Sequence, residues 1–424
     1  MTKNTYVDSE IGRIECTVSG RLAAMLKPKE YIYSITEEEL IFDVAACNSY
    51  RKMTDLLNRV LHRPSDKELK VTTVMEHLES QGRKIGICQH EIAAGILREA
   101  PGLSEEGIVD SIDEIPDAIR NPQSLSQTKM TEKQKAFKDV IDAYNSDAEE
   151  CDKIKNQKLI DDTELDPDEC VYIAIDDVGV KHQKDTRKDG GSKEGKYVEN
   201  TVIHVESKEG KYTITDVGMK NAFTLLVAFL VSNNLLENRF LYFFSDGAKN
   251  IKANIEEYFK PLCPYTLMLD WYHLEKRMTE LLSMALRGSK DERHNIRYTL
   301  DRKLWAGNFD DAKNYLQNLE RKHIKNQQRL DDAIDYLERK KENAACYALR
   351  KELGYRNSSN PAEKENDLVV ANRQKHNGMS WSYAGSGALA SITAMARNGE
   401  TDEWIRSGEI RFGFDDNNKK QLAA

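Results

Sequence analysis

The sequence predicts an α/β fold in which helices flank a mixed β-sheet, and two patterns support this prediction most directly. Between residues 171 and 270 the apolar runs alternate in the order β-β-β-α-β-α-β. From residue 274 to about residue 352 the apolar residues instead recur at helical spacing, with almost no strand pattern. We therefore expect a sheet layer, then a helical region, with a further helical region before them.

The composition is that of a water-soluble chain with enough apolar residues to fold. Its 424 residues suffice for two or three domains, with 39% apolar and 31% charged residues. The net charge is −9, but residues 101–170 hold 19 acids and 8 bases, whereas residues 274–376 hold 22 bases and 17 acids. Because binding depends on the local field, the basic region remains compatible with a nucleic-acid partner.

Some classes of protein are disfavoured by features that the sequence lacks. The 7 cysteines include no C-x-x-C pair, which argues against a finger or ribbon zinc site and fits a reducing cytoplasm. No apolar signal segment follows Met1, and the longest apolar run, residues 222–231, is too short to span a bilayer. We expect a cytoplasmic protein that does not insert into membranes.

The first 100 residues are expected to be mainly helical. Apolar spacing predicts helical structure between residues 37 and 60, a helix over residues 71–79 and another over residues 89–97. The turn Gln81-Gly82-Arg83-Lys84 would join the last two as a helix-turn-helix, the motif of many DNA-binding proteins. Plain packing of a small helical bundle explains the pattern equally well. Residues 101–170 are acidic and contain four prolines; we interpret them as a connector, with residues 131–144 as a possible amphipathic helix.

Acidic residues end three of the predicted strands, and this is the main indication of chemistry. Asp176 follows the strand of residues 171–175, Asp246 follows residues 239–245, and Asp270 follows residues 267–269. Ligands of α/β sheets lie beyond the carboxyl ends of parallel strands, so Asp176 and Asp246 converge if their strands are neighbours. Clustered carboxylates repel one another unless a cation lies among them. The sequence therefore predicts a site for a hard metal ion.

Each proposed acid has a rival use or a rival residue. Asp176 and Asp177 are adjacent, so strand alternation points them to opposite faces and only one can serve; Asp176, which follows the apolar run directly, is preferred. Asp246 would alternatively cap the helix that begins just after it. A third acid is expected beyond the helical region, where Glu363 and Glu365 stand two apart on a predicted helix, so again only one faces the site.

The joint pattern resembles the RNase H-like DDE transposases of bacterial insertion sequences and their Mutator-like relatives. The matching segments are the first-acid strand, Ser245-Asp246-Gly247-Ala248, the D-x-x-H signature Asp270-Trp271-Tyr272-His273, and residues 362–382. In the last segment a Glu is followed by Asn, an Arg-x-Lys pair and Gly-Met-x-Trp, like the closing helix of that family. The resemblance spans roughly residues 170–397 and implies an RNase H-like mixed sheet with an all-α insertion.

The resemblance also implies a division of the chain and a set of site residues. The catalytic, metal-binding acids would be Asp176, Asp246 and Glu363, holding Mg²⁺ or Mn²⁺, with Glu365 on a solvated face. The expected division is a DNA-binding region (1–100), an acidic connector (101–170), the first part of the core (171–273), an all-helical insertion (274–355), the closing helix of the core (356–398) and a tail (399–424).

Other residues are expected to support the site or bind DNA. Asp270 and His273 are interpreted as supporting residues, with structural support preferred over direct catalysis because such a pair alone cannot form a zinc site. DNA phosphates would be bound by the loop after the first acid and by the end of the closing helix, through Lys184, Arg187, Lys188, Arg373 and Lys375. An ordinary exposed loop and a solvated helix end are the alternatives.

The function that the resemblance implies is DNA transposition. The enzyme would cut the 3′ ends of an element, and each freed 3′-OH would attack target DNA. The partners would be transposon ends, target DNA and further copies of the chain, at the bacterial nucleoid. The alternatives are an RNase H-like nuclease without strand transfer and an inactive, transposase-derived DNA-binding protein. A hydrolase of small phosphate esters would leave the basic helical region unexplained.

Overall fold

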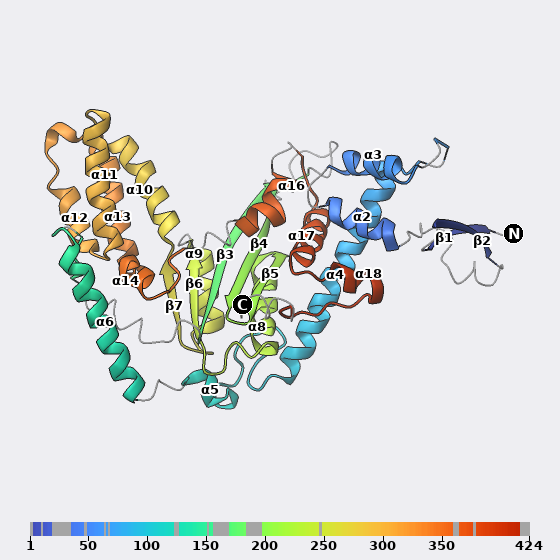
Figure 1. The fold of residues 1–424 in the computed structure, drawn as a ribbon, viewed down its shortest axis with the longest axis horizontal. Coiled ribbons are helices and arrows are strands. Elements are labelled where there is room, and N and C mark those ends of the chain that lie inside the picture. Colours follow the sequence, from blue (N-terminus) through green and yellow to red (C-terminus); the bar gives the residue numbers. More distant parts are fainter. Residues whose placement is uncertain are drawn as a thin grey trace.

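A mixed sheet with helices on both faces forms the centre of the molecule (Figure 1). The computed structural model describes residues 3–9, 12–18, 35–45, 49–62, 65–66, 68–122, 127–150, 152–155, 169–183, 197–245, 248–358, 364–375 and 379–415. The α/β class predicted from the sequence is confirmed. No helix in these ranges is both long enough and apolar enough to cross a bilayer.

The central sheet has five strands in the order β5-β4-β3-β6-β7. The strands are β3 (Cys170–Lys181), β4 (Tyr197–Ser207), β5 (Gly210–Val217), β6 (Phe240–Ser245) and β7 (Tyr265–Leu269). β3, β4 and β5 pair antiparallel, whereas β6 is parallel to β3 and β7 is parallel to β6. The parallel strands need crossover connections, which the buried helix α8 (Met219–Ser232) and α9 (Lys249–Phe259) provide. This is the predicted element order.

Alternate residues of β3 belong to different cores, because successive strand side chains point to opposite faces of the sheet. Val171, Ile173 and Ile175 lie in a core that includes α8 and α9. Cys170 and Ala174 lie in a second core, together with Tyr242, Phe244 and the helices that follow β7. In this part of β3, the odd-numbered residues therefore face the first core and the even-numbered residues face the second.

The N-terminal helices pack beside the β5 edge of the sheet. They are α2 (Ile35–Ala45), α3 (Tyr50–Val60) and α4 (Val71–Glu99), and α4 contacts both α8 and the C-terminal helix α17 (Tyr383–Arg397). α18 (Thr401–Ser407) contacts α2. The strands β1 (Lys3–Ser9) and β2 (Gly12–Val18) form a separate antiparallel hairpin.

The predicted turn at residues 81–84 is wrong, because these residues lie inside α4, which is a continuous helix of 29 residues. Gly82 is instead the point where α4 meets α17 most closely: a Cβ added there would lie 2.1 Å from the backbone oxygen of Ala388. The helix-turn-helix that depended on this turn is therefore not formed by these residues. The glycine permits close helix packing rather than a change of chain direction.

The acidic residues after α4 contain more helix than their composition suggested. η1 (Ile112–Glu114) and α5 (Asp117–Arg120) are short, but α6 (Gln127–Asp147) has 21 residues. Val140, Ile141 and Tyr144 of α6 pack against a small core with Ile154 and Leu349. The solvated connector that we preferred is thus wrong for α6, and the amphipathic helix considered for residues 131–144 is present.

After β7 the chain forms a block of helices, which we call the helical block. Its elements are α10 (Trp271–Ala285), α11 (Lys290–Trp305), α12 (Phe309–Gln317), η3 (Arg321–His323), α13 (Gln327–Lys340), η4 (Lys341–Asn343) and α14 (Tyr347–Glu352). The block stands on the opposite side of the sheet from α2, α3 and α4 (Figure 1). The chain then returns to the sheet through residues 364–374, the closing helix, made of one helical turn, the π-helical η5 (Asp367–Ala371) and α16 (Asn372–Gln374).

Candidate active site

Asp176 lies in the middle of β3, so the prediction that it ends its strand is wrong: pairing with β6 stops at Ala174, but pairing with β4 continues to Lys181. Hydrogen bonds from the backbone and from the closing helix hold its partly buried carboxylate. Oδ1 accepts from the backbone N–H of Asp177 at 2.9 Å. Oδ2 accepts from the Nδ2 of Asn366, on the closing helix, at 2.6 Å. Residues 190 positions apart in the sequence are thereby joined at one carboxylate.

Asp177 points to the opposite face of the sheet, as strand alternation requires. Its Oδ1 accepts from the Thr201 hydroxyl at 2.7 Å, and its Oδ2 accepts from the Nδ2 of Asn250 at 3.0 Å. Asn250 lies in the first turn of α9. Asp177 therefore ties β3 to β4 and to α9, whereas Asp176 faces the closing helix.

The second predicted acid, Asp246, lies outside the described residues, which stop at Ser245 and resume at Ala248. The strand that leads to it is well defined. β6 pairs in parallel with β3, with Ala174 opposite Phe244. β6 ends at Ser245, and α9 begins at Lys249.

The third predicted acid, Glu363, also lies outside the described residues, but its rival Glu365 is well defined. Glu365 is only 7% exposed. It makes a two-pronged ion pair with Arg397 of α17, with Nη2 2.5 Å from Oε1, and its Oε2 accepts from the Thr213 hydroxyl at 3.4 Å. The solvated face expected for Glu365 is wrong. Its carboxylate is committed to an internal ion pair, because Arg397 lies opposite it on α17.

Asn366 is a site residue that the sequence reasoning did not select. It is 5% exposed and donates its Nδ2 to Asp176. Its Oδ1 is buried and accepts no hydrogen bond within the described part of the chain. An unsatisfied buried carbonyl of this kind typically destabilises a protein by about 1–3 kcal/mol. Its spacing of three residues, about one helical turn, from Glu363 was the available signal.

A buried histidine, His204, lies on the same face of the sheet as Asp176. His204 on β4 pairs with Ala174, two residues before Asp176. Burial lowers the pKa of the His204 imidazole, and its Nδ1 lies 3.4 Å from the Thr213 hydroxyl. Arg397 neutralises Glu365 nearby.

Asp270 and His273 lie at the start of the helical block. Asp270 is fully buried, and its Oδ1 accepts from the backbone N–H of Tyr272 at 2.9 Å, which caps α10. The Nε2 of His273 lies 3.9 Å from the Oδ2 of Asp270. This geometry orients the first turn of α10 where it leaves the sheet.

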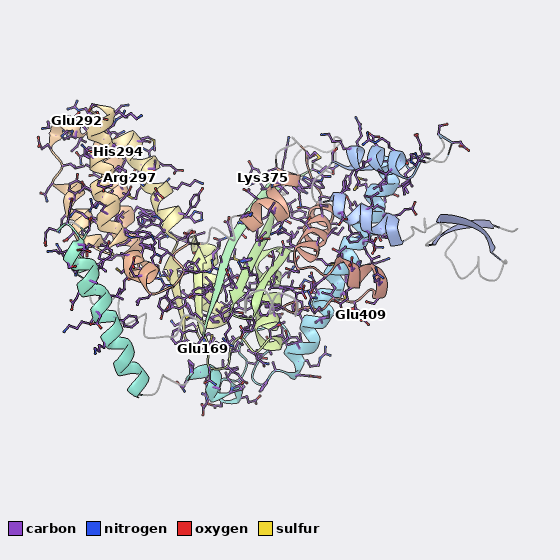
Figure 2. The ribbon with its side chains drawn as sticks, in the orientation of Figure 1. Glu169, Glu292, His294, Arg297, Lys375 and Glu409 are labelled. Carbon is purple, nitrogen blue, oxygen red and sulfur yellow. The ribbon has the colours of Figure 1, made fainter. Side chains whose placement is uncertain are left out.

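The predicted DNA-binding residues differ in exposure, and the structure does not describe all of them. Lys184, Arg187 and Lys188 lie outside the described residues. Lys375 is exposed, and Figure 2 shows it at the end of the closing helix, above the sheet. Arg373 is only 1% exposed, so its predicted phosphate contact does not fit the structure.

Arg373 lies in the core because two aromatic rings enclose it. Its guanidinium carbon lies 4.9 Å from the ring centre of Tyr50 on α3 and 5.1 Å from that of Trp381. Its Nη1 donates to the sulfur of Met379 at 3.6 Å, but Nε and Nη2 have no acceptor among the described residues. Burial lowers the pKa of this guanidinium. No local pattern indicates this burial, because Tyr50 lies more than 300 residues earlier.

The described residues suit a hard cation in their chemistry. Within the described ranges no three His, Cys, Asp or Glu side chains converge, and two of the three predicted acids lie outside those ranges. Asp176 offers a carboxylate, and Asn366 beside it offers an amide oxygen that no donor satisfies. Carboxylate and amide oxygens are the ligands that Mg²⁺ and Mn²⁺ accept.

Comparison with known proteins adds little to this geometry. No protein-family model and no curated protein match the chain. Among solved structures, the Drosophila P element transposase strand transfer complex matches with a TM-score of 0.26 and 10% sequence identity, over 95% of this chain and 89% of that chain. A TM-score this low carries no argument about fold or function, so the functional proposal has to rest on the residues themselves.

Proposed function

We propose that the chain is an RNase H-like DNA transposase that cuts transposon ends and joins them to target DNA. One observation carries the proposal: the closing helix, which follows the helical block, returns to the sheet and hydrogen-bonds the carboxylate of Asp176. An acid in the middle of β3 is thus linked to the segment that carries the late glutamate. This is the arrangement that a site of two early acids and one late acid requires.

The register of the sheet supports Asp246 as the second acid. β3 and β6 pair in parallel from Cys170 with Phe240 to Ala174 with Phe244. Continued for two more residues, this register would pair Asp176 with Asp246. Directly paired residues on neighbouring strands point to the same face, so the two carboxylates would converge.

Helical spacing supports Glu363 as the third acid. Residues three apart on a helix lie on one face, and Asn366, three residues after Glu363, reaches Asp176. Extending the helix upstream by one residue would therefore direct Glu363 toward Asp176. Glu365 faces elsewhere and is already paired with Arg397.

The three acids would hold Mg²⁺ or Mn²⁺, which supplies water activation and charge stabilisation for an in-line attack on a phosphodiester. Asp176 contributes a carboxylate whose orientation two hydrogen bonds fix before any ligand binds. Such pre-orientation favours catalysis, because no free energy is then needed to order the side chain during the reaction.

The layout of the chain agrees with this proposal. The strand order β5-β4-β3-β6-β7, with β4 antiparallel to β3, is compatible with an RNase H-like sheet. The helical block lies between the second and third proposed acids, as an insertion into such a core would. We propose transposon ends and target DNA as partners, contacted in part by the exposed Lys375. Pairing two ends would need two or more copies of the chain, at the bacterial nucleoid.

A cleavage and joining assay tests the proposal, with DNA that carries the repeats flanking the element. Asp176→Asn and Asp246→Asn should each lower Mg²⁺-dependent cleavage by more than about 100-fold while DNA binding persists, because only the metal ligand is lost. The matched control is Asp177→Asn, which changes the neighbouring acid on the opposite face and should retain cleavage.

The same assay separates the alternative functions. Cleavage without joining would indicate an RNase H-like nuclease, and DNA binding without cleavage would indicate an inactive, transposase-derived DNA-binding protein. Full cleavage by Asp176→Asn, or an equal loss in Asp177→Asn, would exclude the site as we assign it.

A further inference from the structure

The amide of Asn366 has only one orientation that suits its surroundings. An ionised carboxylate accepts hydrogen bonds and cannot donate them, so the atom 2.6 Å from Asp176 Oδ2 must be the amide nitrogen. The amide oxygen is therefore not the atom that contacts Asp176 Oδ2. It is this oxygen that is buried and accepts no hydrogen bond from any described residue.

Two comparably buried asparagines have partners for their amide oxygens among the described residues, whereas Asn366, like the half-buried Asn254 and Asn357, does not; of these three, Asn366 is the one whose amide also contacts Asp176. The Oδ1 of Asn398 accepts from the Thr213 backbone N–H at 2.8 Å, and its Nδ2 donates to the Thr213 carbonyl at 2.9 Å. The amide of Asn200 likewise exchanges hydrogen bonds with the hydroxyl of Ser386. A buried amide with an unused oxygen is unfavourable for folding, so a ligand that satisfies it is the economical explanation.

The chemistry of that ligand follows from the neighbouring charge. The unused oxygen lies on the same side chain that binds the Asp176 carboxylate. A neutral oxygen beside a carboxylate attracts a cation and repels an anion, which excludes a phosphate oxygen as its direct partner. Hard divalent cations accept carboxylate and amide oxygens together in one coordination shell.

We propose that Asn366 completes the cation site of Asp176, with two roles for its two ends. The amide nitrogen positions the Asp176 carboxylate, and the amide oxygen binds the divalent cation. This inference rests on the proposed function, since it takes the cation to be the one that Asp176 holds. It adds a neutral oxygen ligand from the closing helix to the three proposed acids.

The choice of asparagine has a physical reason. An aspartate at this position would place a second carboxylate against Asp176 and would repel it, and a leucine of similar volume would offer neither donor nor acceptor. The leucine variant is the most informative. It removes the unsatisfied oxygen, which favours folding, and the hydrogen bond to Asp176, which opposes it; because the two effects offset, the cation-free protein should stay folded while the oxygen ligand is lost.

The test is a Mn²⁺ titration of the purified full-length chain by calorimetry, combined with thermal unfolding with and without Mn²⁺. Asn366→Leu should weaken Mn²⁺ binding by about 10–100-fold, as loss of a supporting metal contact typically does, and should keep the melting temperature of the Mn²⁺-free protein. The control is Asn398→Leu, which loses two hydrogen bonds to β5. It should lower that melting temperature and leave Mn²⁺ affinity within about twofold.

Two results would overturn different claims. Unchanged Mn²⁺ affinity in Asn366→Leu, with weakened affinity in Asp176→Asn, would refute the role of Asn366 and leave the proposed function intact. Unchanged affinity in Asp176→Asn as well would refute the cation site itself, and the proposed function with it.

Discussion

At the scale of single residues, a buried glutamate fixes the C-terminal segment against the sheet. Glu400 is fully buried and accepts hydrogen bonds from the Tyr212 hydroxyl at 3.1 Å and from the Phe412 backbone N–H at 3.0 Å. Burial raises the pKa of the Glu400 carboxyl from its ordinary value of 4.5 to about 7. Folding therefore favours the protonated form of the Glu400 side chain over the ionised form.

The raised pKa of Glu400 predicts that the free energy of unfolding falls as the pH rises. Because the folded state binds the proton more tightly than the unfolded state, the stabilisation is complete below about pH 4.5 and is lost as the pH rises to about 7. The loss is on the order of 3 kcal/mol. Glu400→Gln should remove this decline, seen as a flatter pH dependence of the free energy of unfolding in urea.

The control for Glu400 is Glu409→Gln, which changes an exposed glutamate of the same segment (Figure 2). It should follow the pH dependence of the wild type. If Glu400→Gln also followed the wild type between pH 5 and 8, the protonated state that we assign to Glu400 would be refuted.

Arg373 leads to a second prediction at this scale. A buried charge with no carboxylate partner among the described residues is unfavourable by several kcal/mol, and its two aromatic contacts recover about 1–2 kcal/mol each. Arg373→Met, which keeps most of the volume, should therefore unfold at the same temperature or higher. Arg373→Ala should lose about 2–4 kcal/mol through the cavity that it leaves. Equal losses in both variants would show that the charge itself stabilises the fold.

At the scale of elements, two glycines of α4 test how closely that helix packs against α17. Gly82→Ala should destabilise the protein by about 1–3 kcal/mol, because its Cβ would overlap the backbone of Ala388 on α17. Gly95→Ala has open space and should instead stabilise it by about 0.5–1 kcal/mol, because alanine favours helix. Chemical denaturation of both variants measures the difference. A neutral Gly82→Ala would contradict the close packing of α4 and α17.

The same helix shows what the sequence could and could not predict. The order of the strands and crossover helices was predicted correctly, because alternation and apolar runs are local patterns, although β3 continues beyond the predicted end to Lys181. Gly82 was misassigned, because a glycine serves equally in a turn or in a close helix contact, and the deciding partner, Ala388, lies about 300 residues away. Glu365 was misassigned as solvated for the same reason, since Arg397 decides its burial.

At the scale of the whole molecule, the candidate site depends on long-range assembly. Local sequence predicted the start of the strand that carries Asp176 but not its continuation to Lys181, and the contact of Asp176 with Asn366 depends on how the chain returns after the helical block. No local pattern reports a contact between residues 190 apart. Residue types therefore suggested the acids, whereas the hydrogen bond that joins Asp176 to the closing helix emerged only from the fold.

The central claim is that Asp176, Asp246 and Glu363 share one divalent-cation site. Anomalous diffraction from crystals grown with Mn²⁺ tests it most directly. We predict an anomalous peak roughly 2 Å from a carboxylate oxygen of each of the three residues. Carboxylates more than about 10 Å apart, or a peak that Asp176 does not contact, would contradict the claim.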